Sequence, residues 1–176
     1  MMQSAEGWLD NEDKQCRDDR LNRLKWVVEQ YPNIEISLFH GGLKSHYLFE
    51  EARYCFVYGQ YIASIMLSLS YIENTLASVF YASGRSDLQR ASLVNLLEEA
   101  KEKGLISESE FAVFNKVREI RNPIAHFRKP MDKETIEWRV VKNDRHPYEL
   151  VEEDAKTALK AVFRMIAKFS IPKHED

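Results

Sequence analysis

Hydrophobic residues return every three or four positions along most of the chain, which is the spacing of an amphipathic helix. Residues 11–31 follow this pattern until Pro32 ends it, and they predict a first helix. Residues 33–44 lose the pattern and contain the Gly41-Gly42 pair, so they are predicted to form a loop.

The next helical pattern begins at Ser45, which is a good N-cap residue, and continues to about Ala82. Within it, residues 61–72 are apolar on nearly every side and are followed at once by Glu73 and Asn74. An apolar run of about 12 residues is too short to cross a membrane, which takes about 20. This segment is therefore predicted to be a central core helix that contacts other helices on several sides.

Three further helices complete the pattern. An amphipathic helix is predicted over residues 87–103, with Gly104 as its C-terminal cap. Ser107 and Glu110 have the S-x-x-E spacing of a capping box, and they mark the start of a fourth helix that runs toward Arg121. The last helix is predicted over residues 151–169.

Residues 128–149 are polar and include two prolines, at positions 130 and 147. The sequence TIEWRVV alternates briefly, so a short strand or hairpin is predicted between residues 134 and 148. About five helices with short connections pack most simply as an antiparallel bundle, and the predicted fold class is all-α. The 176 residues suit one domain, in which residues 1–44 pack as an N-terminal helix and loop on a bundle of residues 45–170.

Composition excludes several classes of protein. The formal net charge of −3 gives no overall attraction to nucleic acid or to an anionic membrane. Cys16 and Cys55 lack the spacing of a zinc site or of a disulfide framework. The N-terminus has neither the basic nor the apolar region of a secretion signal, so a cytoplasmic protein is expected. No pattern indicates a metal or a cofactor.

The stretch RNPIAHFR, residues 121–128, contains the candidate chemistry. At about 100° per residue, Arg121 returns to the helix face that Phe114 and Val117 occupy, so its guanidinium is predicted to point toward the core. A buried guanidinium is costly unless it is paired or opens onto a cleft. Some anionic or polar group is therefore expected to receive it.

Pro123 removes a backbone donor and disfavours helical geometry at Asn122, so a kink is predicted between Arg121 and His126. The Asn-Pro order also fits the start of a new helix with Asn122 as its N-cap. A kink lets Arg121 and His126 reach one cleft near a helix N-terminus, which suits an anion. The alternative is a capped, kinked helix with one surface histidine and no function.

An all-α chain with Arg121, Asn122 and His126 near the end of a core helix resembles the HEPN superfamily. That superfamily has an R-x4–6-H motif, usually with a polar residue after the arginine, and the resemblance covers about residues 45–169. Many of its members are metal-independent endoribonucleases of toxin–antitoxin, defence and RNA-processing systems, and they act as dimers with both motifs at the interface. The resemblance implies an RNA substrate, a homodimer, an antitoxin or another regulatory protein as partner, no cofactor and no membrane association.

The resemblance assigns catalysis to Arg121 and His126, and a capping and orienting role to Asn122. Cleaving RNA without a metal requires a base for the 2′-hydroxyl, an acid for the leaving 5′-oxygen and a cation beside the phosphorane. One chain supplies a single His126, so a two-fold dimer would complete the set with two imidazoles and two guanidiniums. Arg121 suits the phosphate because its planar fork binds two oxygens at once.

Residues 116–146 carry a surplus of about four positive charges, which suits a local phosphate-binding surface. Within this segment, Arg118, Arg128 and Lys129 are predicted to bind RNA; a solvated loop of mixed charge is the alternative. Glu73 is predicted to support the site by accepting a hydrogen bond from Arg121. Otherwise Glu73 faces solvent or pairs with a different cation.

Arg139 and His146 fit the same loose spacing as the motif, but they lie in the polar segment and are interpreted as a coincidence. The competing function comes from another class. It is a non-catalytic HEPN-like bundle that binds nucleotide, RNA or a protein, in which Arg121 and Asn122 only hold the kink and the dimer.

Overall fold

The computed structural model describes residues 4–32 and 36–172. These residues form an all-α fold, as predicted. The elements are α1 (Ala5–Gln30), β1 (Ile36–Leu38), α2 (Gly42–Val57), α3 (Tyr61–Ala82), the 3-10 turn η1 (Ser86–Leu88), α4 (Leu93–Glu102), α5 (Glu108–Ala125), α6 (Ile136–Asn143), α7 (Pro147–Phe169) and β2 (Ile171–Pro172). β1 and β2 pair antiparallel and form the one small sheet within the described residues.

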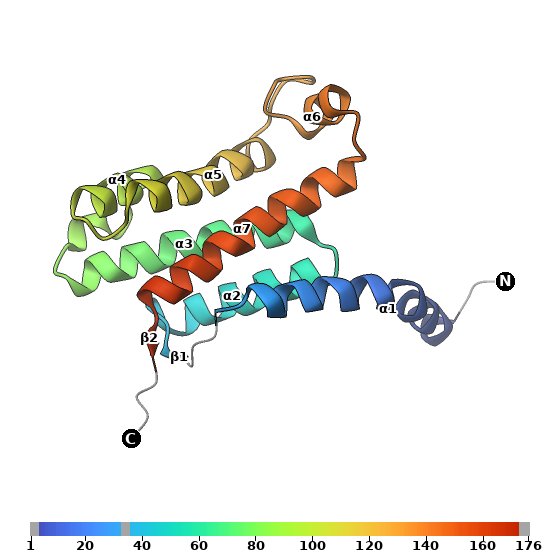
Figure 1. Ribbon diagram of the computed structural model, residues 1–176, viewed down its shortest axis with the longest axis horizontal. Coiled ribbons are helices and arrows are strands. Elements are labelled where there is room, and N and C mark those ends of the chain that lie inside the picture. Colours follow the sequence, from blue (N-terminus) through green and yellow to red (C-terminus); the bar gives the residue numbers. More distant parts are fainter. Residues whose placement is uncertain (1–3, 33–35, 173–176) are drawn as a thin grey trace.

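Helix α3 is the centre of the bundle, because it contacts α2, α4, α5 and α7. Figure 1 shows α4 and α5 along one side of α3 and α7, with α2 and α1 along the other. By length and mean hydropathy α3 would also pass as a membrane span, which is a property that it shares with the core helices of many proteins. Its buried residues face the neighbouring helices on several sides, as the apolar run predicts.

The single long helix predicted from Ser45 to Ala82 is wrong: this segment forms two antiparallel helices, α2 and α3. The chain reverses at residues 58–60, where Gly59 has a φ of +77°. The positive φ favours glycine at this position, and a Cβ atom there would also displace the Tyr148 hydroxyl. Helical periodicity continues through the turn, and periodicity alone therefore does not reveal it.

The start of α2 and the middle of α3 meet in a close polar contact. Ser45 is buried inside the first turn of α2 and does not cap it; Gly41, with a φ of +87°, takes the N-cap position. The Asn74 Nδ2 donates to the Ser45 Oγ at 2.7 Å. A Cβ atom at Gly41 would collide with both of these polar atoms. Asn74 is therefore one of the polar residues of α3 that fix how α2 packs.

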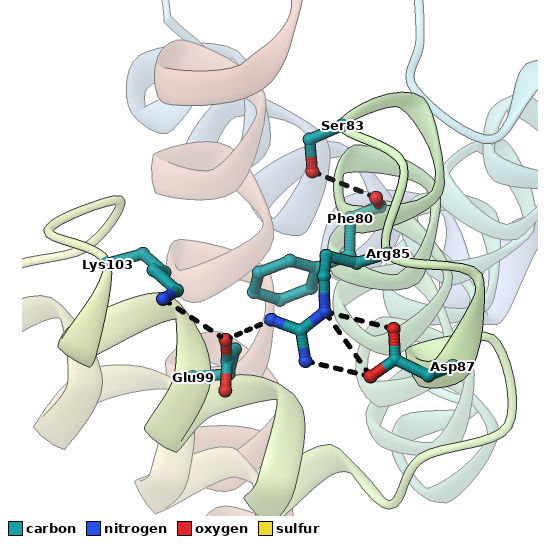
Figure 2. A network of polar contacts seen from close by, with 6 residues as sticks. All are labelled: Phe80, Ser83, Arg85, Asp87, Glu99 and Lys103. Carbon is teal, nitrogen blue, oxygen red and sulfur yellow. Dashed lines mark hydrogen bonds and ion pairs between the residues drawn. The ribbon is translucent and has the colours of Figure 1, made fainter.

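The connection from α3 to α4 is fastened by the side chain of Arg85, as Figure 2 shows. Arg85 Nε donates to Asp87 Oδ1 at 2.9 Å and Arg85 Nη2 donates to Asp87 Oδ2 at 2.8 Å, while Arg85 Nη1 donates to Glu99 on α4. Lys103 Nζ lies 3.9 Å from the same Glu99 carboxylate. The hydrogen bonds from Arg85 hold the pKa of Asp87 below its usual value. The predicted helix over residues 87–103 is thus η1 followed by the shorter α4, which Ser92 caps.

The capping box at the start of α5 is confirmed. The Glu110 backbone N–H donates to the Ser107 Oγ at 3.2 Å, and the Ser107 backbone N–H donates to the Glu110 carboxylate at 2.7 Å. Lys168 near the end of α7 donates to the same carboxylate, at 2.8 Å from Oε2. This pair ties the first turn of α5 to the last turn of α7, so the two helices run antiparallel.

The predicted hairpin between residues 134 and 148 is wrong, because this segment contains α6. The Thr135 Oγ1 caps α6 by accepting from the Trp138 backbone N–H at 3.3 Å, and Asp144 ends the helix with a φ of +48°. The alternation that suggested a strand covers only a few residues, and such a short run also fits one face of a short helix. The capping threonine is the sequence signal that favours the helix.

Helix α1 is longer than its predicted 11–31 range, since it begins at Ala5 with Ser4 as its N-cap. Its second half packs on α2, where Trp26 lies 5.0 Å from Phe56 between ring centroids and Arg23 Nε donates to the Val57 carbonyl at 2.8 Å. Figure 1 shows the first half of α1 extending past the end of the bundle. Contact with the core therefore stabilises only the second half.

Candidate functional site

Helix α5 continues through Pro123 and ends at Ala125. His126 is its C-cap, with an extended backbone (φ −128°, ψ 134°), and its N–H donates to the Asn122 carbonyl at 3.1 Å. No helix begins at Asn122, so the predicted N-cap of a new helix there is wrong. The proline falls in the last turn, where the helix is about to end anyway, and its cost to the helix is therefore small.

Arg121 lies on the core face of α5, close to the fully buried Phe114 and Val117 of the same face. Its side chain is half-buried, and its Nε atom is buried without a hydrogen-bond partner in the part of the chain that the structure describes. No ion pair to a described residue neutralises the guanidinium either. The inward direction of Arg121 is therefore confirmed, and the group that should receive it is missing from the described part of this chain.

The predicted contact between Glu73 and Arg121 is not formed. Ile62 of α3 lies beside the end of α5, in a cavity that it shares with Pro123. Glu73 is eleven residues further along α3, which places it roughly 16 Å away along the helix axis. It lines a separate cavity of about 260 Å³ that also contains Asn74. The sequence did not reveal this separation, because the turn at Gly59 shifts where α3 begins.

Asn122 faces a polar groove of about 500 Å³ between α5, α6 and α7. With its amide oxygen turned toward Arg118, it accepts from Arg118 Nη1 at 3.2 Å and donates to the Arg118 carbonyl at 3.2 Å. Arg118 Nε also donates to Asn115 Oδ1 at 2.8 Å. Asn122 thus orients Arg118, one turn earlier in the helix. Lys116, Lys133 and Arg139 add further cations to this groove.

His126 lies in a second cavity, of about 480 Å³, on the other side of Pro123. Its imidazole is exposed and makes no hydrogen bond to any residue that the structure describes. Phe127 and Arg128 line the same cavity, and Arg128 Nε pairs with Glu134 Oε2 at 3.2 Å. Lys129 is exposed and has no ion pair within the described ranges.

The motif is therefore divided among three places in one chain. Asn122 faces the polar groove, His126 lines the cavity beyond Pro123, and Arg121 lines neither of the two. The single cleft predicted for Arg121 and His126 is not assembled by the described residues of one chain. Among those residues no group of three or more histidine, cysteine, aspartate or glutamate side chains is arranged to hold a metal ion.

Comparison with known proteins places more than half of the chain, including α5, in one family. A family model described as a domain of unknown function (DUF4145) matches residues 50–144, which is more than half of the chain. The chain belongs to the DUF4145 family. No curated protein and no solved structure is detectably similar to it. The DUF4145 match begins within α2 and ends just after α6. It includes the residues of α5 that line the polar groove and the His126 cavity.

Sequence reasoning missed a buried ion pair that lines the same polar groove as Asn122. Arg139 of α6 binds Asp154 of α7 with both arms, at 2.5 and 2.9 Å. Asp154 is only 7% exposed, and its carboxylate raises the pKa of Arg139. Asp154 stands on the apolar stripe that Val151, Ala155 and Ala158 form on the last helix. A charged side chain on an apolar stripe is the signal that singled out Arg121. The same signal, here a carboxylate, could have revealed the Arg139–Asp154 pair.

Replacing Arg139 with alanine in the DUF4145 domain is expected to lower the free energy of unfolding by about 2–3 kcal/mol, because the buried Asp154 loses its counter-ion. Urea denaturation followed by circular dichroism measures this change. The double variant Arg139→Leu with Asp154→Leu is the control. It should recover most of the loss, since no buried charge is left unpaired. A single variant as stable as wild type would contradict this assignment.

Proposed function

We propose that the protein is a metal-independent endoribonuclease of the HEPN type that acts as a homodimer through Arg121 and His126. The observation that carries this proposal is the inward guanidinium of Arg121, whose buried Nε lacks a partner within the described residues. A buried polar group without a partner is costly, and it persists where a ligand completes it. A phosphate oxygen is the natural acceptor for a guanidinium.

The proposed reaction needs no cofactor. A neutral His126 takes the proton from the 2′-hydroxyl as its oxygen attacks phosphorus, and a protonated His126 of the second chain gives a proton to the departing 5′-oxygen. Arg121 stabilises the charge on the phosphorane between these two events. The products are a 2′,3′-cyclic phosphate and a 5′-hydroxyl. Each chain supplies one imidazole, so the base and the acid come from different chains.

Apolar surface beside His126 supports a dimer. Ile62 and Tyr148 are 50% and 48% exposed, and they line a groove of about 740 Å³ between the start of α3 and the start of α7. This groove and the His126 cavity share Ile62 and Ile136. A second copy packed on the groove would bury these side chains and bring a second His126 close to the first.

The wider setting follows from the HEPN resemblance and is part of the same proposal. The enzyme would act in the cytoplasm as a toxin or defence effector, held in check by an antitoxin or another regulatory protein. Arg118, Arg128 and Lys129 would contact the RNA backbone. Arg118 is held in place by Asn122, and Lys129 is free of ion pairs within the described residues, which suits both for phosphate contact.

Incubation of the purified protein with diverse RNAs in the presence of EDTA tests this function. We expect cleavage that the chelator does not reduce, and 3′ fragments that carry a 5′-hydroxyl. The matching 5′ fragments should end in a 2′,3′-cyclic phosphate, which acid treatment opens. Intact RNA at high protein concentration would contradict the proposal.

A non-catalytic binding module is the second candidate, and one observation favours it. The imidazole of His126 is not oriented by any described residue of its own chain, whereas Arg118 is fixed by both Asn115 and Asn122. A preoriented arginine in a polar groove suits the binding of nucleotide, RNA or an acidic protein surface. Binding of RNA without cleavage, equal in wild type and in His126→Ala, would support this function instead.

A further inference from the structure

Phe127 is the most exposed large hydrophobic side chain that the structure describes, with 88% of its surface accessible. It follows His126 directly and lines the same cavity beyond Pro123. The Phe127 ring does not belong to the hydrophobic core, and it makes no aromatic or cation–π contact within the described residues. A phenyl ring presented in this way suits a partner with a flat apolar face.

The surroundings of Phe127 favour a nucleobase as that partner. Arg128 and Lys129 follow it in the chain, and Lys129 has no ion pair within the described residues. Phe127 and His126 are adjacent in the chain and line the same cavity, so a phosphate held at His126 would lie near the ring. Aromatic rings interleaved with cations are the arrangement that binds single-stranded nucleic acid, where the ring stacks on a base and the cations contact phosphates.

We propose that Phe127 is the stacking platform for an unpaired base next to the phosphate that His126 and Arg121 act on. The proposal rests on the RNA-binding part of the proposed function. It makes Phe127 a positioning residue, and it favours RNA that is single-stranded at the cleavage site, because a base held in a duplex must first be unpaired and unstacked at an energetic cost. Any base can stack, so the platform selects strandedness and not sequence.

The rival role for Phe127 is burial against a second copy of the chain. The two roles differ in what they require of the side chain. Stacking requires a flat aromatic ring, so tryptophan replaces phenylalanine and leucine does not. Packing at an interface requires apolar volume, so leucine serves nearly as well as phenylalanine. The mass of the protein in solution separates the two roles further.

The experiment measures RNA binding in the His126→Ala background, which prevents cleavage during the measurement. A fluorescently labelled single-stranded RNA is titrated with this protein and with its Phe127→Ala, Phe127→Leu and Phe127→Trp versions. We expect Phe127→Ala and Phe127→Leu to weaken binding about 5- to 100-fold and Phe127→Trp to bind like the parent. Tyr81→Ala, at the far end of α3, is the matched control for loss of an exposed aromatic ring and should change nothing.

A set of RNAs with one abasic position each locates the stacked base. At one position, removal of the base should weaken binding by the parent, and Phe127→Ala should then cause no further loss. Equal binding by Phe127→Leu and the parent, or a fall to monomer mass in Phe127→Ala, would overturn the proposal and assign Phe127 to an interface. RNA cleavage by the wild type in EDTA is measured separately, so a failed platform is distinguished from a failed enzyme. A wild type that binds no RNA overturns both.

Discussion

Replacing Arg121 with methionine is expected to raise the melting temperature by about 2–4 °C and to lower RNA cleavage at least about a hundredfold. Methionine keeps the apolar stem beside Phe114 and Val117 and removes a guanidinium whose buried Nε has no partner within the described residues. Removing such a group should stabilise the fold by about 1 kcal/mol. The same change removes the cation that is proposed to stabilise the phosphorane. Scanning calorimetry and the RNA assay measure the two effects on one preparation.

Arg118→Met is the matched control, because Arg118 lies one turn earlier on the same helix and is hydrogen-bonded to both Asn115 and Asn122. Its loss should lower the melting temperature, since the side-chain oxygens of Asn115 and Asn122 both lose the donor that the Arg118 guanidinium supplies. Arg121→Lys keeps the charge but loses the planar fork, and should recover only part of the activity. A lower melting temperature in Arg121→Met would show that Arg121 holds the fold, and would contradict a site that awaits a phosphate.

Replacing His126 with alanine is expected to lower RNA cleavage by about 10²–10⁴-fold and to leave stability within about 0.5 kcal/mol of wild type. The imidazole is exposed at the end of α5 and makes no hydrogen bond to a described residue, so the fold does not depend on it. Thermal unfolding and cleavage rates, measured in parallel, separate a catalytic loss from a structural one.

His146→Ala provides the opposite pattern. His146 is the N-cap of α7, where its Nδ1 accepts from the Tyr148 backbone N–H at 3.2 Å. Its removal should cost about 0.5–2 kcal/mol of stability. His146 also lines the groove proposed for the second copy, so the cleavage rate should fall only as far as the dimer is weakened, and far less than in His126→Ala. Loss of cleavage in His146→Ala together with full cleavage in His126→Ala would assign the chemistry to the other histidine and contradict the proposed site.

Local signals in the sequence predicted those parts of the fold that short-range chemistry determines. The capping box of Ser107 and Glu110 and the apolar stripes of α3, α5 and α7 all appear as expected. The turn at Gly59 was missed because apolar residues keep their helical spacing on both sides of it. The short helix α6 was mistaken for a hairpin because a six- or seven-residue pattern fits both periods about equally well.

In the candidate site, too, the sequence predicted what local geometry determines and missed what tertiary structure determines. The inward direction of Arg121 follows from helix geometry alone, and it is present in the structure as a half-buried guanidinium. The direction of the His126 side chain does not follow from helix geometry, because α5 ends at Ala125 and His126 takes an extended backbone. The predicted contact between Glu73 and Arg121 depended on where α3 begins. The turn at Gly59 sets that position, and the helical pattern did not reveal the turn. The Arg121 Nε has no hydrogen-bond partner among the described residues of this chain, so no local pattern within them could name one.

The proposed function requires that the end of α5 cuts RNA without a metal and that His126 takes part in the cleavage. The most direct measurement is RNA cleavage in excess EDTA by wild type and by His126→Ala in parallel, with the ends of the fragments identified. We expect chelator-resistant cleavage that leaves 2′,3′-cyclic phosphates, and near-complete loss of this cleavage in a folded His126→Ala protein. Cleavage that EDTA abolishes, or that His126→Ala retains at the wild-type rate, would contradict it.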